Sequence, residues 1–79
     1  MAVMTKAEAK TFMAMDDRMI DILDFLKTKG VLNEKNHRKI LLSGYFRLVE
    51  YLEKEKVITG AQAKEAQDNG FDDLISALQ

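Results

Sequence analysis

The chain has 79 residues, with 12 basic and 13 acidic side chains and a formal net charge of −1. This length allows one domain with a small core, and the balanced charge removes the basic excess that is typical of nucleic-acid binders. No cysteine is present, which excludes disulfides, thiolate metal sites and a cysteine nucleophile, and favours a cytoplasmic protein.

Helix breakers are scarce in this sequence, because it contains no proline and only four glycines. The apolar fraction of 47% is typical of a globular protein. No apolar run approaches the ~20 residues that cross a bilayer, so we expect no membrane association. We therefore predict an all-α fold, a compact bundle of four to six short helices in a single helical domain over residues 1–79.

The first helix is predicted to begin after Thr5, which forms a capping box with Glu8, and residues 1–4 are expected to be a flexible N-terminus. We favour separate helices over residues 5–15 and 17–29, because the aspartates between them can cap a new helix. The alternative is one continuous helix.

Turn and cap residues mark the rest of the chain. Gly30 fits the C-cap of the second helix, and Asn33 fits the N-cap of the next one. The remaining predicted elements follow in chain order: an apolar link at 31–32, a helix at 34–42, a turn at 43–44, a helix at 45–56, an apolar link at 57–58, an N-cap at Thr59, a thin alanine-rich helix at 60–67, a turn at 68–70 and a last short helix from Phe71.

The sequence echoes itself at a spacing of 26 residues. The apolar pattern of Ile22–Leu26 returns as Leu48–Leu52, and the turn Ser43-Gly44-Tyr45 returns as Asn69-Gly70-Phe71. Such matching predicts two related helix–link–helix units. Two unrelated hairpins that follow the same capping rules are the other interpretation.

The predicted core follows from the helical spacing of the apolar residues. It comprises Phe12, Met19, Ile22, Leu23, Phe25, Leu26, Leu32, Ile40, Leu41, Tyr45, Leu48, Val49, Leu52, Ile58, Phe71, Leu74, Ile75 and Leu78.

No set of residues supports catalysis, a metal site or a cofactor. His37 is the single histidine, and we expect it on a solvated helix surface because its neighbours are basic. Residues 68–73 lack the ligand spacing and the closing glutamate of a calcium-binding EF-hand loop. We therefore expect a protein that is not an enzyme and needs no cofactor.

The chain contains Arg47-Leu48, Leu52 and Val57-Ile58-Thr59, and in the earlier copy of the echo Leu26 and Gly30-Val31-Leu32. These fragments resemble the tandem cyclic-di-GMP-binding motif in the N-terminal domain of pilus and secretion ATPases. That motif requires a glycine after the Arg-Leu pair, and Val49 occupies this position. The leucine-leucine-glutamine positions later in the motif are also missing in one or both copies, so we assign the chain to no family.

We expect the protein to bind another protein through a helix face, as an adaptor, an inhibitor of a larger protein or a dimeric assembly factor. Met13 and Met15 cannot both point into one apolar stripe, so one of them is expected on the surface. Asp17, Asp21 and Asp24 fall on one helix face, where they could meet a basic partner. These five residues are the candidate protein-binding site. A homodimer is as compatible with so small a core as a monomer.

The alternative is a DNA-binding regulator of the helix-turn-helix type. It would use Lys35, Arg38, Lys39 and Arg47, in the basic region 35–47. The glutamates that follow Arg47 would face phosphate unfavourably, so nucleic acid is the less favoured partner.

Overall fold

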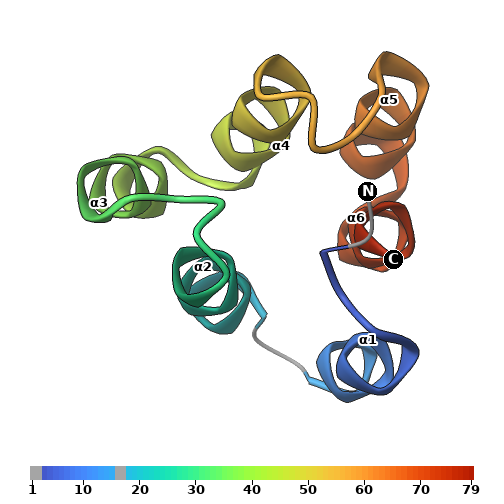
Figure 1. Ribbon diagram of the computed structural model, residues 1–79. Helices are drawn as coiled ribbons and strands as arrows, with labels where there is room; N and C mark the ends of the chain where they lie inside the picture. The colour runs from blue at the N-terminus through green and yellow to red at the C-terminus, as the bar shows by residue number, and fades with distance from the viewer. Residues whose placement is uncertain (1–2, 16–17) are drawn as a thin grey trace.

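The computed structural model describes residues 3–15 and 18–79, and these residues form six α-helices and no strand (Figure 1). The helices are α1 (Lys6–Met13), α2 (Met19–Thr28), α3 (Glu34–Ser43), α4 (Tyr45–Lys54), α5 (Gly60–Asn69) and α6 (Phe71–Leu78). The predicted all-α bundle of short helices is confirmed. Two helices, and not one, precede Gly30, and the predicted start of the second at residue 17 lies outside the described residues.

Local sequence signals explain most of the helix boundaries. In the capping box of α1, the Thr5 hydroxyl accepts from the Glu8 N–H at 3.1 Å, and the Glu8 carboxylate accepts from the Thr5 N–H at 2.9 Å. Asn33 and Thr59 cap α3 and α5 in the same way, by accepting from the backbone N–H three residues on. Helix α4 ends two residues earlier than predicted, because Lys56 adopts a left-handed φ of 61° that terminates the helix.

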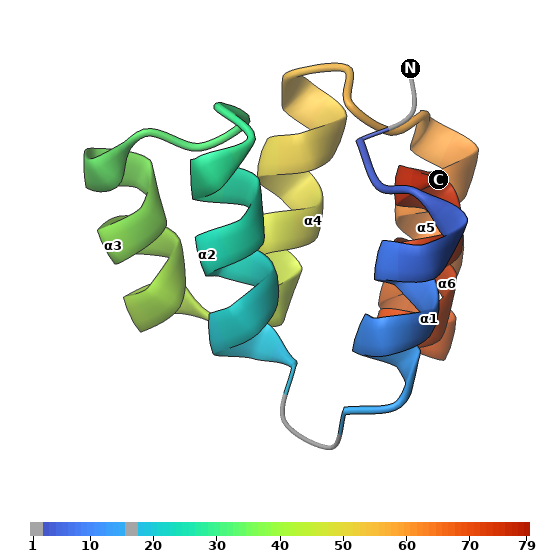
Figure 2. The ribbon, with the colours of Figure 1, turned by 60° about the horizontal axis from the view of Figure 1, so that its bottom comes forward.

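The six helices of the described segments form a ring (Figure 1). Neighbours contact each other in the order α2, α3, α4, α5, α6 and α1, so that α1 packs beside the last helix of the chain. Helices α2, α4 and α6 lie nearer the centre, and α3, α5 and α1 lie outside them. Successive helices alternate in direction, so that α1, α3 and α5 finish at the end of the molecule where α2, α4 and α6 begin (Figure 2).

The 26-residue echo is present in the structure as a repeated unit of one inner and one outer helix. Helices α2 and α4 begin 26 residues apart, and so do α3 and α5. Gly44 and Gly70 follow the two outer helices with φ values of 98° and 96°, in the region that favours glycine. In each unit, one leucine carbonyl oxygen accepts two hydrogen bonds from the apolar link. These bonds join Leu26 to Val31 and Leu32 at 2.9 and 3.3 Å, and Leu52 to Val57 and Ile58 at 2.9 and 3.4 Å.

The two ends of the chain complete a third unit of the same kind. The carbonyl oxygen of Leu78 accepts hydrogen bonds from the N–H groups of Val3 at 2.8 Å and Met4 at 3.0 Å. Helix α1 therefore follows α6 in space as α3 follows α2, although no peptide bond joins them. The prediction of a flexible N-terminus is wrong for Val3 and Met4, since Met4 is only 2% exposed. Residues 1–2 lie outside the described residues.

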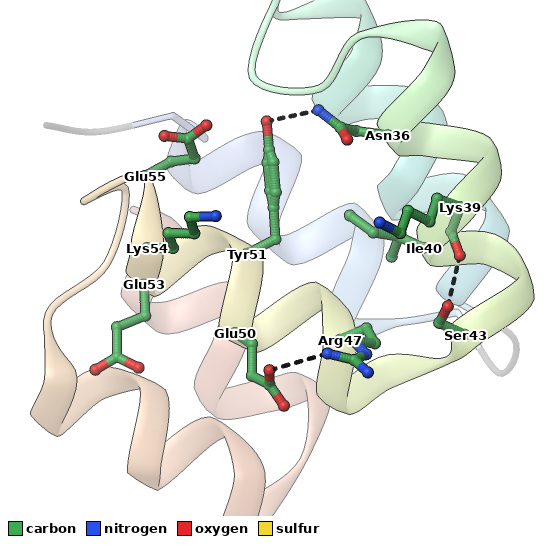
Figure 3. Close-up of a pocket in the computed structure, with 10 residues that line it drawn as sticks. All are labelled: Asn36, Lys39, Ile40, Ser43, Arg47, Glu50, Tyr51, Glu53, Lys54 and Glu55. Carbon is green, nitrogen blue, oxygen red and sulfur yellow. Dashed lines mark hydrogen bonds and ion pairs between the residues drawn. The ribbon is translucent and has the colours of Figure 1, made fainter.

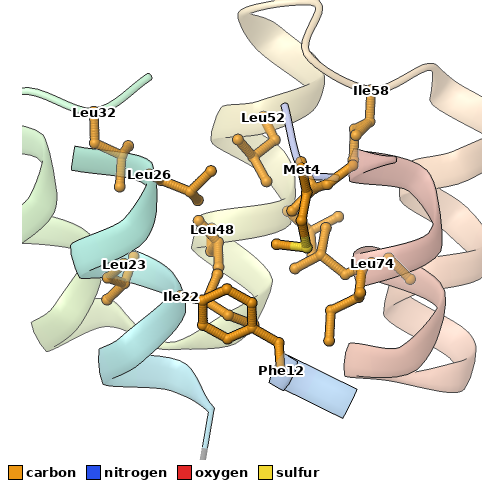
Figure 4. Packing of buried hydrophobic residues seen from close by; sticks show 14 of the residues in the cluster. Met4, Phe12, Ile22, Leu23, Leu26, Leu32, Leu48, Leu52, Ile58 and Leu74 are labelled. Atoms are coloured by element: carbon orange, nitrogen blue, oxygen red, sulfur yellow. The ribbon is translucent and has the colours of Figure 1, made fainter. Parts of the chain in front are cut away.

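The core lies inside the ring, and its largest fully buried side chains come from equivalent positions of the three inner helices (Figure 4). Phe12, Leu32, Ile40 and Ile58 are also buried, as predicted. Met19, Phe25, Tyr45 and Phe71 are half-buried and pack against the edge of this cluster. The fully buried residues of the inner helices are Ile22, Leu23 and Leu26 in α2, Leu48, Val49 and Leu52 in α4, and Leu74, Ile75 and Leu78 in α6.

Besides the buried Met4, two further features of the core differ from the prediction. Leu41 is exposed, because Ile40 takes the inward position on α3 and one residue step turns the side chain by about 100°. Three buried alanines, Ala9, Ala63 and Ala66, were not predicted as core. Their small side chains let the outer helices α1 and α5 approach the ring closely, and alanine gives no strong apolar signal in the sequence.

Candidate functional site

The end of the molecule at which α2, α4 and α6 begin carries the exposed apolar side chains, and we call it the corner end (Figure 2). Every large apolar side chain that is exposed in the described segments lies in the first or last turn of a helix at this end. These side chains are Met13 (39% exposed), Ile20 (52%), Leu41 (41%), Leu42 (84%) and Phe46 (61%).

Leu42 and Phe46 flank the sharp corner between α3 and α4. Gly44 makes this corner with its positive φ, and its N–H donates to the carbonyl oxygen of Ile40 at 2.9 Å. Ile40 and Tyr45 are the residues of the two helices that face the core here, so Leu42 and Phe46 are left in solvent. The corner thus presents two large apolar side chains on regular helical backbone.

Ile20 and Leu41 lie along the seam between α2 and α3. Near the middle of this seam, His37 Nε2 and Asp24 Oδ1 are 2.9 Å apart, and the His37 side chain is only 16% exposed. The prediction of a solvated His37 is therefore wrong: the imidazole links two helices. Because α2 and α3 are antiparallel, one turn towards the corner end leads from Asp24 to Ile20 and from His37 to Leu41.

The structure describes four of the five residues predicted to bind a protein. Met13 and Asp21 are exposed, whereas Met15 is half-buried and packs against the core. Asp24 is engaged with the histidine of α3, and Asp17 lies outside the described residues. Of this set, Met13 is the apolar side chain that the structure leaves exposed at the corner end.

Three of the predicted basic residues share the outer face of α3. Lys35, Arg38 and Lys39 line a shallow hollow together with Leu42. The Arg38 guanidinium is 3.8 Å from the carboxylate of Glu34, in an exposed pair of the kind that contributes little to stability. The long side-chain stems surround the exposed Leu42 with apolar surface and positive charge.

The fourth basic residue, Arg47, lies in a groove of about 620 Å³ between α3 and α4 (Figure 3). Its Nη1 is 3.5 Å from Oε2 of Glu50. Asn36 Nδ2 donates to the Tyr51 hydroxyl at 3.2 Å and links the two helices near the other end of the groove. The remaining lining residues are Lys39, Ile40, Ser43, Glu53, Lys54 and Glu55. The groove therefore mixes both signs of charge.

Two tyrosine hydroxyls have a structural role. The Tyr45 hydroxyl donates to the carbonyl oxygen of Ala66 at 2.7 Å, and burial, with a contribution from the Asp73 carboxylate, raises the pKa of Tyr45 to about 12. Burial also raises the pKa of Tyr51, and the nearby Glu55 adds to this rise. Both groups are therefore neutral hydrogen-bonding phenols at neutral pH.

Within residues 3–15 and 18–79, no group of three or more His, Cys, Asp or Glu side chains could hold a metal ion. None of the helices in these two segments is long and apolar enough to cross a membrane. Comparison of the chain with protein-family models, with curated proteins and with solved structures finds no match.

The candidate site was not found from the sequence, although a signal was present. Leu41 and Leu42 are adjacent on one helix, and Phe46 directly follows Tyr45. Because neighbouring residues on a helix point about 100° apart, such pairs cannot both reach a core on one side. Which member of each pair faces out is decided by how the helices pack.

Proposed function

We propose that this protein is a small non-enzymatic protein-binding module that acts through its corner end. The observation that carries the proposal is the gathering of Met13, Ile20, Leu41, Leu42 and Phe46 at one end of the bundle. Single exposed apolar side chains are normal on protein surfaces, but their restriction to one end is typical of an interaction site.

The energetics favour Leu42 and Phe46 as anchors. Fully burying such a side chain is worth about 1.5–3 kcal/mol, and these two are the most exposed of the set. Both lie in the first or last turn of a helix beside Gly44, so little backbone conformational entropy is lost when a partner covers them. Lys35, Arg38 and Lys39 add positive charge beside Leu42 and favour a partner surface that carries carboxylates.

A pull-down from the native host, read by mass spectrometry, tests the proposal. The bait is the whole chain, as wild type and as the double variant Leu42→Asp/Phe46→Asp. Ala61→Asp is the matched control, because it places the same carboxylate on an exposed alanine in the first turn of α5, at the opposite end of the bundle. A partner retained by the control and lost by the double variant supports the proposal, and one captured equally by all three baits contradicts it.

A DNA-binding regulator is the second candidate, favoured by the shared outer face of Lys35, Arg38 and Lys39. Arg47 does not extend this face, because it lies in the α3–α4 groove beside Glu50. A gel shift at low salt separates the two functions: no binding to duplex DNA at about 100 μM protein eliminates this candidate.

The proposal includes a cytoplasmic location, which is supported by the lack of cysteine in so small a domain. Fractionation of host cells, followed by detection of the protein with an antibody, tests this location.

A further inference from the structure

The repeat provides an internal comparison of two corners that share one backbone geometry. Gly44 and Gly70 make these corners with nearly equal φ, and each donates its N–H to the carbonyl four residues earlier, at 2.9 and 3.0 Å. The side chains around the two corners differ in kind. Counting 26 residues on, Lys39 corresponds to Glu65, Leu42 to Asp68, Phe46 to Asp72 and Arg47 to Asp73.

The α3–α4 corner is therefore basic and apolar, and the α5–α6 corner is acidic. We call them the basic corner (Lys39, Leu42, Phe46 and Arg47) and the acidic corner (Glu65, Asp68, Asp72 and Asp73). The fold does not impose this difference, because the acidic corner has the same backbone without either large apolar side chain. The inner positions, by contrast, are apolar in every unit.

Both corners lie at the corner end, side by side around the ring (Figures 1 and 2). Two copies stacked end to end about a two-fold axis would therefore place the basic corner of each against the acidic corner of the other. Such a contact is made twice and closes on itself, as in most homodimers. We propose that the corner end binds a second copy of this chain in this way, an inference that rests on the proposed function and names its partner.

Charge selects the orientation of this dimer and apolar burial supplies most of its affinity. Two of the four carboxylates of the acidic corner have partners within the chain: Asp72 pairs with Arg18, and Asp73 accepts a hydrogen bond from Asn69 Nδ2 at 2.7 Å. Glu65 and Asp68 are exposed and can face the basic corner of a second copy. Each exposed ion pair contributes little to the free energy of binding. Two patches of opposite charge nevertheless fix how the two surfaces align. Leu42 and Phe46 become covered in the same arrangement.

Sedimentation equilibrium of the whole protein over a range of concentrations tests the proposal. We expect wild type to dimerise reversibly, and to do so more weakly at about 500 mM than at about 50 mM salt. Leu42→Asp/Phe46→Asp copies two residues of the acidic corner onto the basic one, so the helices should be retained. We expect its dimer dissociation constant to rise by about 30-fold or more, while Ala61→Asp leaves the constant unchanged.

A charge-exchange pair gives the decisive result. Lys39→Glu/Arg47→Asp makes both corners acidic, and Glu65→Lys/Asp68→Leu/Asp72→Phe/Asp73→Arg makes both corners basic, with every new residue taken from the equivalent position of the other corner. We expect each variant alone to be monomeric and their mixture to form a heterodimer, with circular dichroism unchanged throughout. Wild type that stays monomeric, or variants that dimerise alone, would overturn this inference. A host partner lost only with Leu42→Asp/Phe46→Asp would then still support the protein-binding module.

Discussion

The N–H of Met4 donates to the carbonyl oxygen of Leu78 across 3.0 Å, and this bond joins the two ends of the chain. It repeats the bonds that Leu32 and Ile58 make to Leu26 and Leu52 in the other two units. Three equivalent hairpins therefore build the ring, and the third is made of the last helix and the first. The third hairpin thus packs like the other two, and it differs in that no peptide bond joins its two helices.

A circular permutant tests this description of the third unit. Residue 79 is joined to residue 1 by a short Gly-Ser linker, and the chain is opened between Asp16 and Asp17. We expect wild-type helicity and a urea midpoint close to that of wild type, because the hydrogen bonds of Leu78 with Val3 and Met4 are kept. A chain that lacks residues 1–15 is the contrasting variant. It should be largely unfolded, since it loses Phe12 and Met4 from a small core. A permutant without a cooperative transition would contradict the three-unit ring.

Met4 and Leu41 form a matched pair for mutation. Met4→Ala should lower the free energy of unfolding by about 2–5 kcal/mol, because it empties a buried position. Leu41→Ala should change it by less than about 1 kcal/mol, because Leu41 is already 41% exposed. Urea denaturation followed by circular dichroism measures both values. The opposite order of effects would mean that the N-terminus does not close the ring.

The glycine at each corner is required by its backbone conformation. Gly44→Ala should destabilise the protein by about 1–3 kcal/mol, because φ is 98° and a Cβ would meet no atom within 4 Å, so the cost is conformational strain alone. Gly60→Ala is the control. Its φ is ordinary and its Cβ would approach only the flexible end of Glu53, at 3.0 Å, so we expect a change of less than about 1 kcal/mol. Thermal unfolding of the two variants gives the comparison. Equal effects would argue against a strained corner.

The Tyr45 hydroxyl makes stability depend on pH in the alkaline range. The pKa of this group is about 12 in the folded protein and near 10.0 when unfolded, so the protonated form is favoured by folding. Its contribution is fully present below pH 10 and is lost as the pH rises from 10 towards 12. Tyr45→Phe should therefore show a smaller fall in urea midpoint over this range than wild type. Parallel pH profiles for the two proteins would exclude Tyr45 as a source of the dependence.

Local signals in the sequence determined the secondary structure and much of the core. Capping residues such as Thr5, Asn33 and Thr59 define helix starts because they satisfy backbone N–H groups within one turn, which requires no distant partner. The inward apolar positions of α2, α4 and α6 follow from helical periodicity, which is also a local property of the sequence. The 26-residue echo likewise predicted two related units.

Tertiary structure alone decided where long-range partners lie. Nothing near Met4 in sequence marks it as buried, because its partner Leu78 is at the other end of the chain. The sequence neighbours of His37 are basic, which predicts a solvated side chain. In the structure the imidazole contacts α2, because Asp24 faces it across the seam. The choice between Leu41 and Ile40, and the exposure of Leu42 and Phe46, depend on which side of each helix meets the ring. Periodicity fixes the angle between side chains, but only packing fixes the direction of the core.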